Sequence, residues 1–456
     1  MSVKKRTLFN QKSMNMTQGQ ILPLLVRFAI PILLGNIFQQ LYNMVDTWVV
    51  GNYVSNEAFS AVGSVGPIIN SLIGFFLGLS SGAGVMVSQY FGAGDEEDVS
   101  KTVHTAFIMT VVFAVLVTVA GFLFTPVFLN MMRTPPEVMP ESLAYLRVYF
   151  AGISGLMLYN IGAAILQAIG DSRSPFVFLT ISAALNIAGD LIFVLVFDMG
   201  VSGVAWATVI AQAISALLVI ATLIKTDTCV KLRLSLLRFD REKFERIVSI
   251  GIPAGLQMAI TSFSNIFVQS YINYFGADCM SGWTAYGKID SVMILPMRAV
   301  SVAATTFAGQ NIGVGDDERV KNGIKIAHRL SFVLLGISML PVMLFAPQLV
   351  AFFNAKAEVV ALGALIIRVM SPCYFIICVY DVLIGVMRGA GETKAPMFIM
   401  LFSFVIFRQI YLYVMTNYIA NEIVPVIMGY PLGWLSCAIL TVIYFRKSEK
   451  TRKYAR

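Results

Sequence analysis

Two carboxyl side chains, Asp46 and Asp190, lie deep inside long apolar stretches of the sequence. Ionisable groups inside a membrane-spanning helix are costly and are usually functional. Lys and Arg are absent from the helix interiors expected in the first half of the chain, so neither acid has a basic partner there. A buried carboxylate without such a partner must be protonated, hydrated or bound to a cation. The two acids are therefore candidates for a site that binds a proton or Na⁺.

Amide and phenol side chains share helix faces with these two acids. The 3.6-residue period puts three polar residues before Asp46 on its face of the helix, and it puts Asn186 one turn before Asp190. A further apolar segment is interrupted by Tyr159 and Asn160. We expect these faces to converge, although interhelical hydrogen bonding alone would also explain Asn186 and Asp190. The predicted ion-coupling residues are Asp46, Asp190, Asn186 and Asn160, and the predicted cavity residues are Gln39, Tyr42, Asn43 and Tyr159.

The second half of the chain carries charges of both signs in its apolar segments. Asp381 lies 221 residues after Asn160 and can be expected at a comparable depth, where Arg408 or Lys288 would be its partner. Two interpretations remain open, a buried structural network and a second ion or substrate site. The charged set consists of Lys288, Asp290, Arg298, Asp381 and Arg408.

The sequence does not indicate a transition-metal site or disulfide bonds. The five Cys form no C-x-x-C pair and the chain has only two His, so neither a zinc site nor a disulfide framework is expected. The one metal that the pattern suits is Na⁺, held by Asp46, Asp190 and Asn186.

The composition indicates an all-α integral membrane protein. The 456 residues are 57% hydrophobic and 13% charged, with a mean hydropathy of +0.78, whereas soluble domains carry roughly 25% charged residues. The net charge is +8, and most Lys and Arg gather in loops that we assign to the cytoplasm. That distribution follows the positive-inside rule, so the basic excess reflects topology and not nucleic-acid binding.

Breaks at Gly, Pro and charge clusters divide the apolar sequence into twelve helices. They are expected at 24–50, 60–90, 102–130, 142–168, 175–197, 201–224, 247–273, 281–309, 324–353, 359–388, 396–418 and 423–445. The resulting organisation is a cytoplasmic N-terminal segment (1–23), a first lobe (24–224), a cytoplasmic linker (225–246), a second lobe (247–445) and a basic cytoplasmic tail (446–456). No signal peptide is expected, because the basic residues 4–6 are followed by a polar stretch.

The two lobes repeat each other. Residues 89–95 read Q-Y-F-G-A-G-D and residues 310–316 read Q-N-I-G-V-G-D, and the loops L-Q-A-I-G-D-S-R-S-P (166–175) and M-R-G-A-G-E-T-K-A-P (387–396) are also 221 residues apart. An even number of helices in each lobe makes the repeats parallel, as in transporters that rock one bundle against the other. We expect the repeated Gly to form turns, and Asp95 and Asp316 to cap the helices that follow.

Several motifs together resemble the multidrug and toxic compound extrusion (MATE) family. They are A-I-P at 29–31, Y-N-M-V-D at 42–46, V-S-Q-Y-F-G-A-G at 87–94, the loop at 166–175, and G-I-P at 251–253. The resemblance covers nearly the whole chain. It implies an efflux antiporter of two six-helix bundles that expels organic, cationic amphipathic compounds in exchange for H⁺ or Na⁺.

Within that family the pattern resembles the DinF-like prokaryotic branch. Asp46 matches the family's acid in the first helix, and Asn186-x-x-x-Asp190 with Asn160 resembles the first-lobe ion-site pattern of that branch. Another branch, typified by NorM, carries acids in the seventh and tenth helices, in the second lobe. Here the seventh helix has no acid, with Thr261 at about that position, and Asp381 lies in the tenth. The resemblance therefore favours coupling in the first lobe.

An enzyme is not expected, since the sequence has no H-E-x-x-H, G-x-S-x-G or Walker A motif. The alternative transporter is a lipid-linked oligosaccharide flippase of the same broader superfamily. We expect no cofactor apart from the coupling ion, and small organic molecules and membrane lipids as partners. The expected setting is a bacterial inner membrane, crossed many times by a protein that acts as a monomer with both termini in the cytoplasm.

Overall fold

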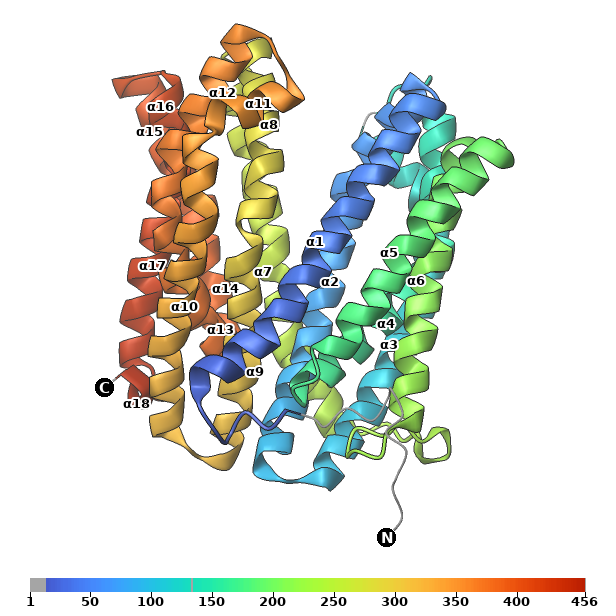
Figure 1. Cartoon of the computed structure of the whole chain (residues 1–456), viewed down its shortest axis with the longest axis vertical. Helices are drawn as coiled ribbons and strands as arrows, with labels where there is room; N and C mark the ends of the chain where they lie inside the picture. Colours follow the sequence, from blue (N-terminus) through green and yellow to red (C-terminus); the bar gives the residue numbers. More distant parts are fainter. Residues whose placement is uncertain (1–13, 133, 456) are drawn as a thin grey trace. The chain divides into compact units, whose positions relative to one another are not determined.

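A computed structural model describes residues 14–132 and 134–455 of the chain (Figure 1). The basic residues 4–6, on which the N-terminal expectation rests, lie outside the described residues. Within the described part, twelve helical stretches are long and apolar enough to cross a membrane. The prediction of an all-helical protein with twelve spans is therefore confirmed.

Six spans make up the first half of the chain. Each overlaps an expected helix, and most extend a few residues further at their ends. The helices are α1 (Ile21–Tyr53), α2 (Asn56–Ala93), α3 (Glu96–Met131), α4 (Met139–Ala168), α5 (Arg173–Leu191) with a π-helical turn (Ile192–Val196), and α6 (Gly200–Lys225).

The second half repeats this order with more interruptions. Pro296, Pro347 and Pro372 stand at the start of helical segments, where the missing N–H and the fixed φ of proline are tolerated. The elements are α7 (Arg241–Asn273), α8 (Ala277–Met293), α9 (Leu295–Val314), α10 (Asp317–Leu344), α11 (Ala346–Phe353), α12 (Ala357–Met370), α13 (Tyr374–Gly389), α14 (Lys394–Met400), α15 (Arg408–Val414), α16 (Ile423–Ile427), α17 (Gly429–Lys447) and α18 (Arg452–Ala455). A π-helical segment (Leu401–Phe407) joins α14 to α15.

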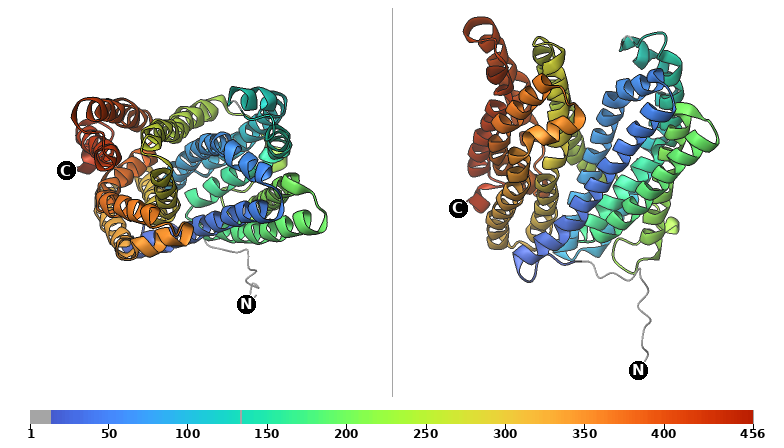
Figure 2. Two further views of the ribbon diagram at one scale, coloured as in Figure 1. Left: turned by 90° about the horizontal axis from the view of Figure 1, so that it is seen from above. Right: turned by 45° about the horizontal axis from the view of Figure 1, so that its top comes forward.

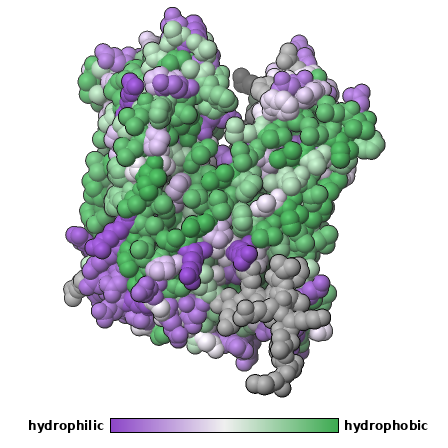
Figure 3. All heavy atoms as spheres, viewed as in Figure 1, coloured by the Kyte–Doolittle hydropathy of each residue, from purple (hydrophilic) through white to green (hydrophobic). Residues whose placement is uncertain are grey.

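The chain forms two compact units. The first contains residues 34–252, and the second contains residues 16–33 together with 253–456. In each unit the helices run roughly alongside one another (Figure 2). On the face drawn in Figure 3, hydrophobic side chains cover the middle of the second unit and hydrophilic ones gather at its lower end, as a membrane-spanning bundle requires.

The first helix of each half starts in the unit formed mainly by the other half. In the first unit, Lys243 at the start of α7 donates to Asp98 Oδ2 (2.7 Å) and to the Tyr90 hydroxyl (2.8 Å). In the second unit, the Met16 N–H donates to Gln310 Oε1 (2.8 Å), and the Met16 carbonyl accepts from the Arg319 guanidinium. The sequence repeat is therefore matched by a repeated exchange of helix starts.

The repeated turns have the expected conformation. Gly94 and Gly315 have φ of 73° and 82°, in the left-handed region that glycine adopts without strain. Asp95 Oδ1 accepts from the Asp98 N–H at 3.0 Å, and Asp316 Oδ1 accepts from the Arg319 N–H at 2.9 Å. Both acids therefore cap the next helix, as predicted.

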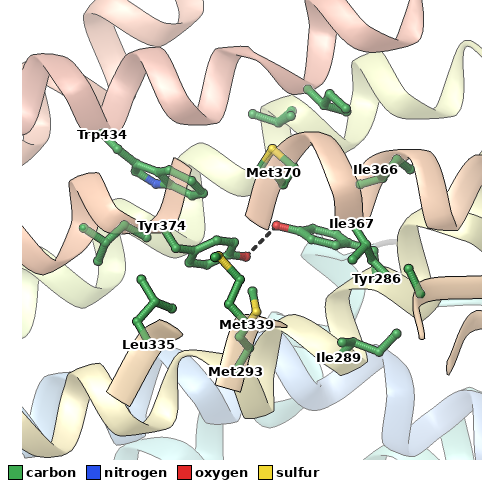
Figure 4. Packing of buried hydrophobic residues seen from close by; sticks show 14 of the residues in the cluster. Tyr286, Ile289, Met293, Leu335, Met339, Ile366, Ile367, Met370, Tyr374 and Trp434 are labelled. Carbon is green, nitrogen blue, oxygen red and sulfur yellow. Dashed lines mark hydrogen bonds between the residues drawn. The ribbon is translucent and has the colours of Figure 1, made fainter. Parts of the chain in front are cut away.

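Helix contacts at glycine bring backbones close together. A Cβ added at Gly82 of α2 would lie 2.5 Å from the Ile247 carbonyl of α7. Glycines of the second unit make similar contacts, since a Cβ added at Gly389 of α13 would lie 2.5 Å from the Thr305 carbonyl of α9, and large side chains fill the core of that unit. The Tyr286 and Tyr374 hydroxyls meet at 2.7 Å among methionines and Trp434 (Figure 4). Small residues at contacts are typical of membrane helices, which gain no hydrophobic energy from associating with one another.

We expect Gly82→Val to lower the apparent melting temperature of the detergent-purified protein by several degrees. The added side chain would collide with the Ile247 carbonyl, a backbone group that cannot rotate away. Overpacking of this kind costs about 1–3 kcal/mol of stability. The matched control is Gly336→Val on α10, where an added Cβ meets nothing within 4 Å. Equal melting temperatures for the two variants in a thermal unfolding assay would contradict the close contact of α2 with α7.

Candidate ion-coupling site in the first unit

The structure brings three of the predicted residues together inside the first unit. Asp46 of α1, Asn186 of α5 and Asp190 of α5 are 7%, 2% and 0% exposed. Asn186 Nδ2 donates to Thr208 Oγ1 of α6 at 3.3 Å. The Thr208 hydroxyl lies 3.5 Å from Asp46 Oδ2 and 3.1 Å from its own helix's Val204 carbonyl, and its one proton can serve either acceptor. Three helices therefore meet at one polar cluster.

The cluster has more hydrogen-bond acceptors than donors. Four buried oxygens accept no hydrogen bond from the described residues: Asp46 Oδ1, Asn186 Oδ1, Asp190 Oδ1 and Asp190 Oδ2. The carboxyl groups of Asp46 and Asp190 are near enough to share a proton, which would make one of them a donor. Within the described part of the chain, neither acid takes part in an ion pair.

Such an arrangement suits a cation. An unsatisfied buried acceptor costs about 1–3 kcal/mol, and a bound proton or Na⁺ relieves that cost. Carboxylate, amide and hydroxyl oxygens are the ligands that hard cations take. Asp46, Asn186 and Asp190, with the Thr208 hydroxyl, have the chemistry to hold Na⁺.

Close helix packing positions these groups. A Cβ added at Gly189 would lie 3.0 Å from the Ala207 Cβ, so α5 and α6 approach closely one residue before Asp190 and Thr208. Gly35 faces α5 from α1, 3.3 Å from Leu179 by the same construction. The π-helical turn begins two residues after Asp190, and turns of this kind often mark functional sites.

Aromatic hydroxyls surround the cluster. Tyr42, one turn before Asp46, is 8% exposed, and it lies near both Gln39 and Asp46. Tyr145 and Tyr149 of α4 stack with ring centroids 6.4 Å apart, and Tyr145 lies within electrostatic reach of both acids. Of the predicted cavity residues, Gln39 and Tyr42 therefore belong to this region.

No hydrogen bond between described residues joins the other predicted residues of the first half to the acids, although Tyr159 lies within electrostatic reach of Tyr42. Asn160 Nδ2 donates to the Leu156 carbonyl of its own helix at 2.9 Å, and no hydrogen bond between described residues joins it to the acids. The Tyr159 hydroxyl donates to the Pro175 carbonyl at 3.1 Å, which ties α4 to the first turn of α5. Asn43 is exposed. These contacts indicate helix packing for Tyr159 and give no direct link to the cluster for Asn160.

Thr208, Tyr145 and Tyr149 were not predicted from the sequence. A threonine in an apolar helix usually bonds to the carbonyl one turn earlier, and Thr208 does so as well as facing Asp46. The one available signal was the pair of tyrosines four residues apart, which share a helix face.

The expected ion pairs of the second half are not formed. None of the ion pairs between described residues includes Lys288, Asp290, Arg298, Asp381 or Arg408. Lys288 and Arg298 are exposed, because they lie on the opposite side of their helices from the buried residues beside them. The cations that act electrostatically on Asp381 are Arg388 and Arg298, rather than Arg408 or Lys288.

Neutral groups contact the buried charges instead. Asp290 accepts from the Tyr374 hydroxyl, which also meets the Tyr286 hydroxyl (Figure 4). Arg408, 2% exposed, donates to Ser264 Oγ and to Asn265 Oδ1 (3.3 Å), and its guanidinium lies 4.6 Å from the centre of the Tyr430 ring. The guanidinium is thus held by polar and cation–π contacts.

Twelve spans built from a parallel repeat define the class of the protein, a secondary transporter of two matched helical bundles. The MatE family pattern matches residues 31–192 and again residues 253–414. These matches cover more than half of the chain, which therefore belongs to the MatE family. It is an efflux transporter of this family and not an enzyme.

Curated relatives and solved structures are similar over nearly the whole length. The chain is 28% identical to probable multidrug resistance protein YpnP of Bacillus subtilis, covering 95% of this chain and 97% of the relative. It is 24% identical to probable multidrug resistance protein NorM of Thermotoga maritima, with 92% and 91% covered. A MOP superfamily transporter from Pyrococcus furiosus has the same fold, with a TM-score of 0.90, 23% identity, and 95% and 97% of the two chains covered.

We expect Asp190→Asn and Thr208→Val to change stability in opposite directions. The first exchange turns a carboxyl group into an amide that can donate toward Asp46, whereas the second removes a hydroxyl donor from the same cluster. Each change is worth about 1–3 kcal/mol. Thermal unfolding at neutral pH should place Asp190→Asn above the parent protein and Thr208→Val below it. A lower melting temperature for both variants would show that the acids are satisfied by the protein itself.

Proposed function

We propose that this transporter is a secondary active antiporter that exports organic, cationic amphipathic compounds in exchange for H⁺ or Na⁺. Support comes first from the four unpartnered oxygens of Asp46, Asn186 and Asp190, which form a buried acidic cluster without a basic partner. It comes also from the relatives, several of which are named as multidrug resistance or multidrug export proteins. Solved complexes of a MATE protein with bound molecules bear the same fold.

The cycle that we propose uses the cluster as a switch. Binding of H⁺ or Na⁺ at Asp46 and Asp190 satisfies the free oxygens and draws α1 toward α5 and α6. The drug is then released on the outer side, and loss of the ion to the cytoplasm resets the cycle. Ion and drug need no shared contacts, because it is enough that they favour opposite states of the protein.

The finer assignments follow from the same cluster. The acid pair lies in the first half of the chain, and Thr261 stands where the branch typified by NorM has an acid in the seventh helix. Both features favour the DinF-like branch of the family. Asn160 is assigned to the helix packing that supports this site. The basic tails favour cytoplasmic termini in a bacterial inner membrane, and each unit has its own core, which is compatible with action as a monomer.

The test is gradient-driven efflux of a fluorescent cationic dye from proteoliposomes. A pH gradient and a Na⁺ gradient are imposed separately on the parent protein, Asp46→Asn and Asp190→Asn. We expect one gradient to drive efflux by the parent, and both variants to fall to the level of empty liposomes, because each keeps its shape and loses an ionisable group.

Asp290→Asn is the matched control. It removes a buried carboxylate of the second unit and should keep gradient-driven efflux. If Asp290→Asn lost efflux to the same extent as the first-unit variants, coupling could not be assigned to the first unit. Absence of dye movement under both gradients, with movement of a fluorescent lipid-linked oligosaccharide, would favour the flippase alternative.

A further inference from the structure

An apolar groove runs along the second unit between α10 and α17. Its volume is about 530 Å³, in the range of about 300–1,000 Å³ that ligand sites occupy. Residues of α13, including Val379, form its floor. Leu435, Ile439 and Ile443 of α17 form one wall and are 42%, 50% and 45% exposed. These positions follow one face of α17 at a spacing of four residues.

Helix α10 is packed and hydrogen-bonded against the floor of the groove. Phe332 of α10 meets Phe375 of α13 there, with ring centroids 5.7 Å apart. One turn below Phe332, His328 Nε2 lies 3.1 Å from the Val379 carbonyl, which fixes α10 against the floor. The groove is therefore a built feature of this unit.

Basic side chains stand where both walls end. Lys325 lies two turns before Phe332 on α10, and Arg446 lies one turn after Val442 and Ile443 on α17. Both are exposed, and neither takes part in an ion pair between described residues. Two acids of this end are paired, Asp317 with Lys453 and Glu392 with Lys450, whereas Glu318 and Glu449 are exposed and take part in no ion pair between described residues. Two cations at the mouth are thus available to an external anion.

We propose that this groove binds an anionic phospholipid, with an acyl chain along the apolar walls and the phosphate between Lys325 and Arg446. The groove lies within the membrane-spanning length of its helices, so lipid is the molecule that meets it. Basic residues at the end of a spanning helix attract anionic headgroups. The first unit lacks this mouth, because the residue 221 positions before Lys325 is His104, which is 2% exposed and bonded to the backbone of Arg233.

The test is lipid retention by the full-length protein in native mass spectrometry. Dioleoyl phosphatidylglycerol is compared with dioleoyl phosphatidylcholine, which has the same chains and no net charge. We expect the parent to retain the anionic lipid preferentially. The pair Lys325→Gln with Arg446→Gln should weaken it roughly 25-fold, since each charge is worth about 1 kcal/mol and 1.4 kcal/mol is tenfold.

Two further variants separate charge from shape. Ile439→Trp fills the groove from a half-exposed position and should weaken both lipids alike. The pair Arg173→Gln with Lys225→Gln removes two exposed charges from the first unit and should change nothing. The proposal would be overturned if the parent retained the two lipids equally, or if both double variants lost the anionic lipid to the same extent. Dye efflux does not enter this test, so its outcome is independent of the proposed antiport.

Discussion

The site in the first unit depends on one constraint: two carboxyl groups are buried in an apolar bundle without a cation of the protein's own. Burial of an ion without a partner is so costly that proteins usually neutralise it. Here α5 and α6 approach closely at Gly189, beside Asp190, and no ion pair between described residues includes Asp46 or Asp190. This lack of a basic partner is the basis of the proposal that Asp46 and Asp190 take up an ion from outside the protein.

In the second repeat, the corresponding helices bury a positive charge, and the protein's own groups satisfy it. The stretch that contains Arg408 corresponds to α5 of the first repeat, because both follow the repeated loops at 166–175 and 387–396, and Ser264 and Asn265 lie 222 residues after Tyr42 and Asn43, the separation between the starts of the two family matches. Arg408 donates to both Ser264 and Asn265. A fixed guanidinium with its own acceptors needs no external ion. In the proposed scheme the first repeat takes up a cation from outside, whereas the buried charge of the second repeat is satisfied by the protein's own groups.

Local rules predicted much of this structure. Long apolar runs, Gly turns and capping aspartates depend on neighbouring residues, so the spans and the caps at Asp95 and Asp316 followed from the sequence. The proximity of Asp46 to Asp190 was predicted from the polar residues that share a helix face with each acid. Thr208 did not, because threonine in a spanning helix has a local bond available. Asp381 forms an ion pair with neither of its two expected partners, Arg408 and Lys288, because charge and depth do not fix the direction of a side chain, which packing decides.

The energy required for coupling is of the size that this cluster can supply. Shifting a two-state equilibrium from 1:99 to 99:1 takes about 5.5 kcal/mol of differential binding. Each unsatisfied buried acceptor is worth about 1–3 kcal/mol, and four of them are present at Asp46, Asn186 and Asp190. Together they amount to about 4–12 kcal/mol, so in the proposed cycle an ion that satisfies most of them in only one of the two states supplies free energy of the required size. A cluster whose oxygens were all bonded by protein donors would be more stable, and it would couple nothing.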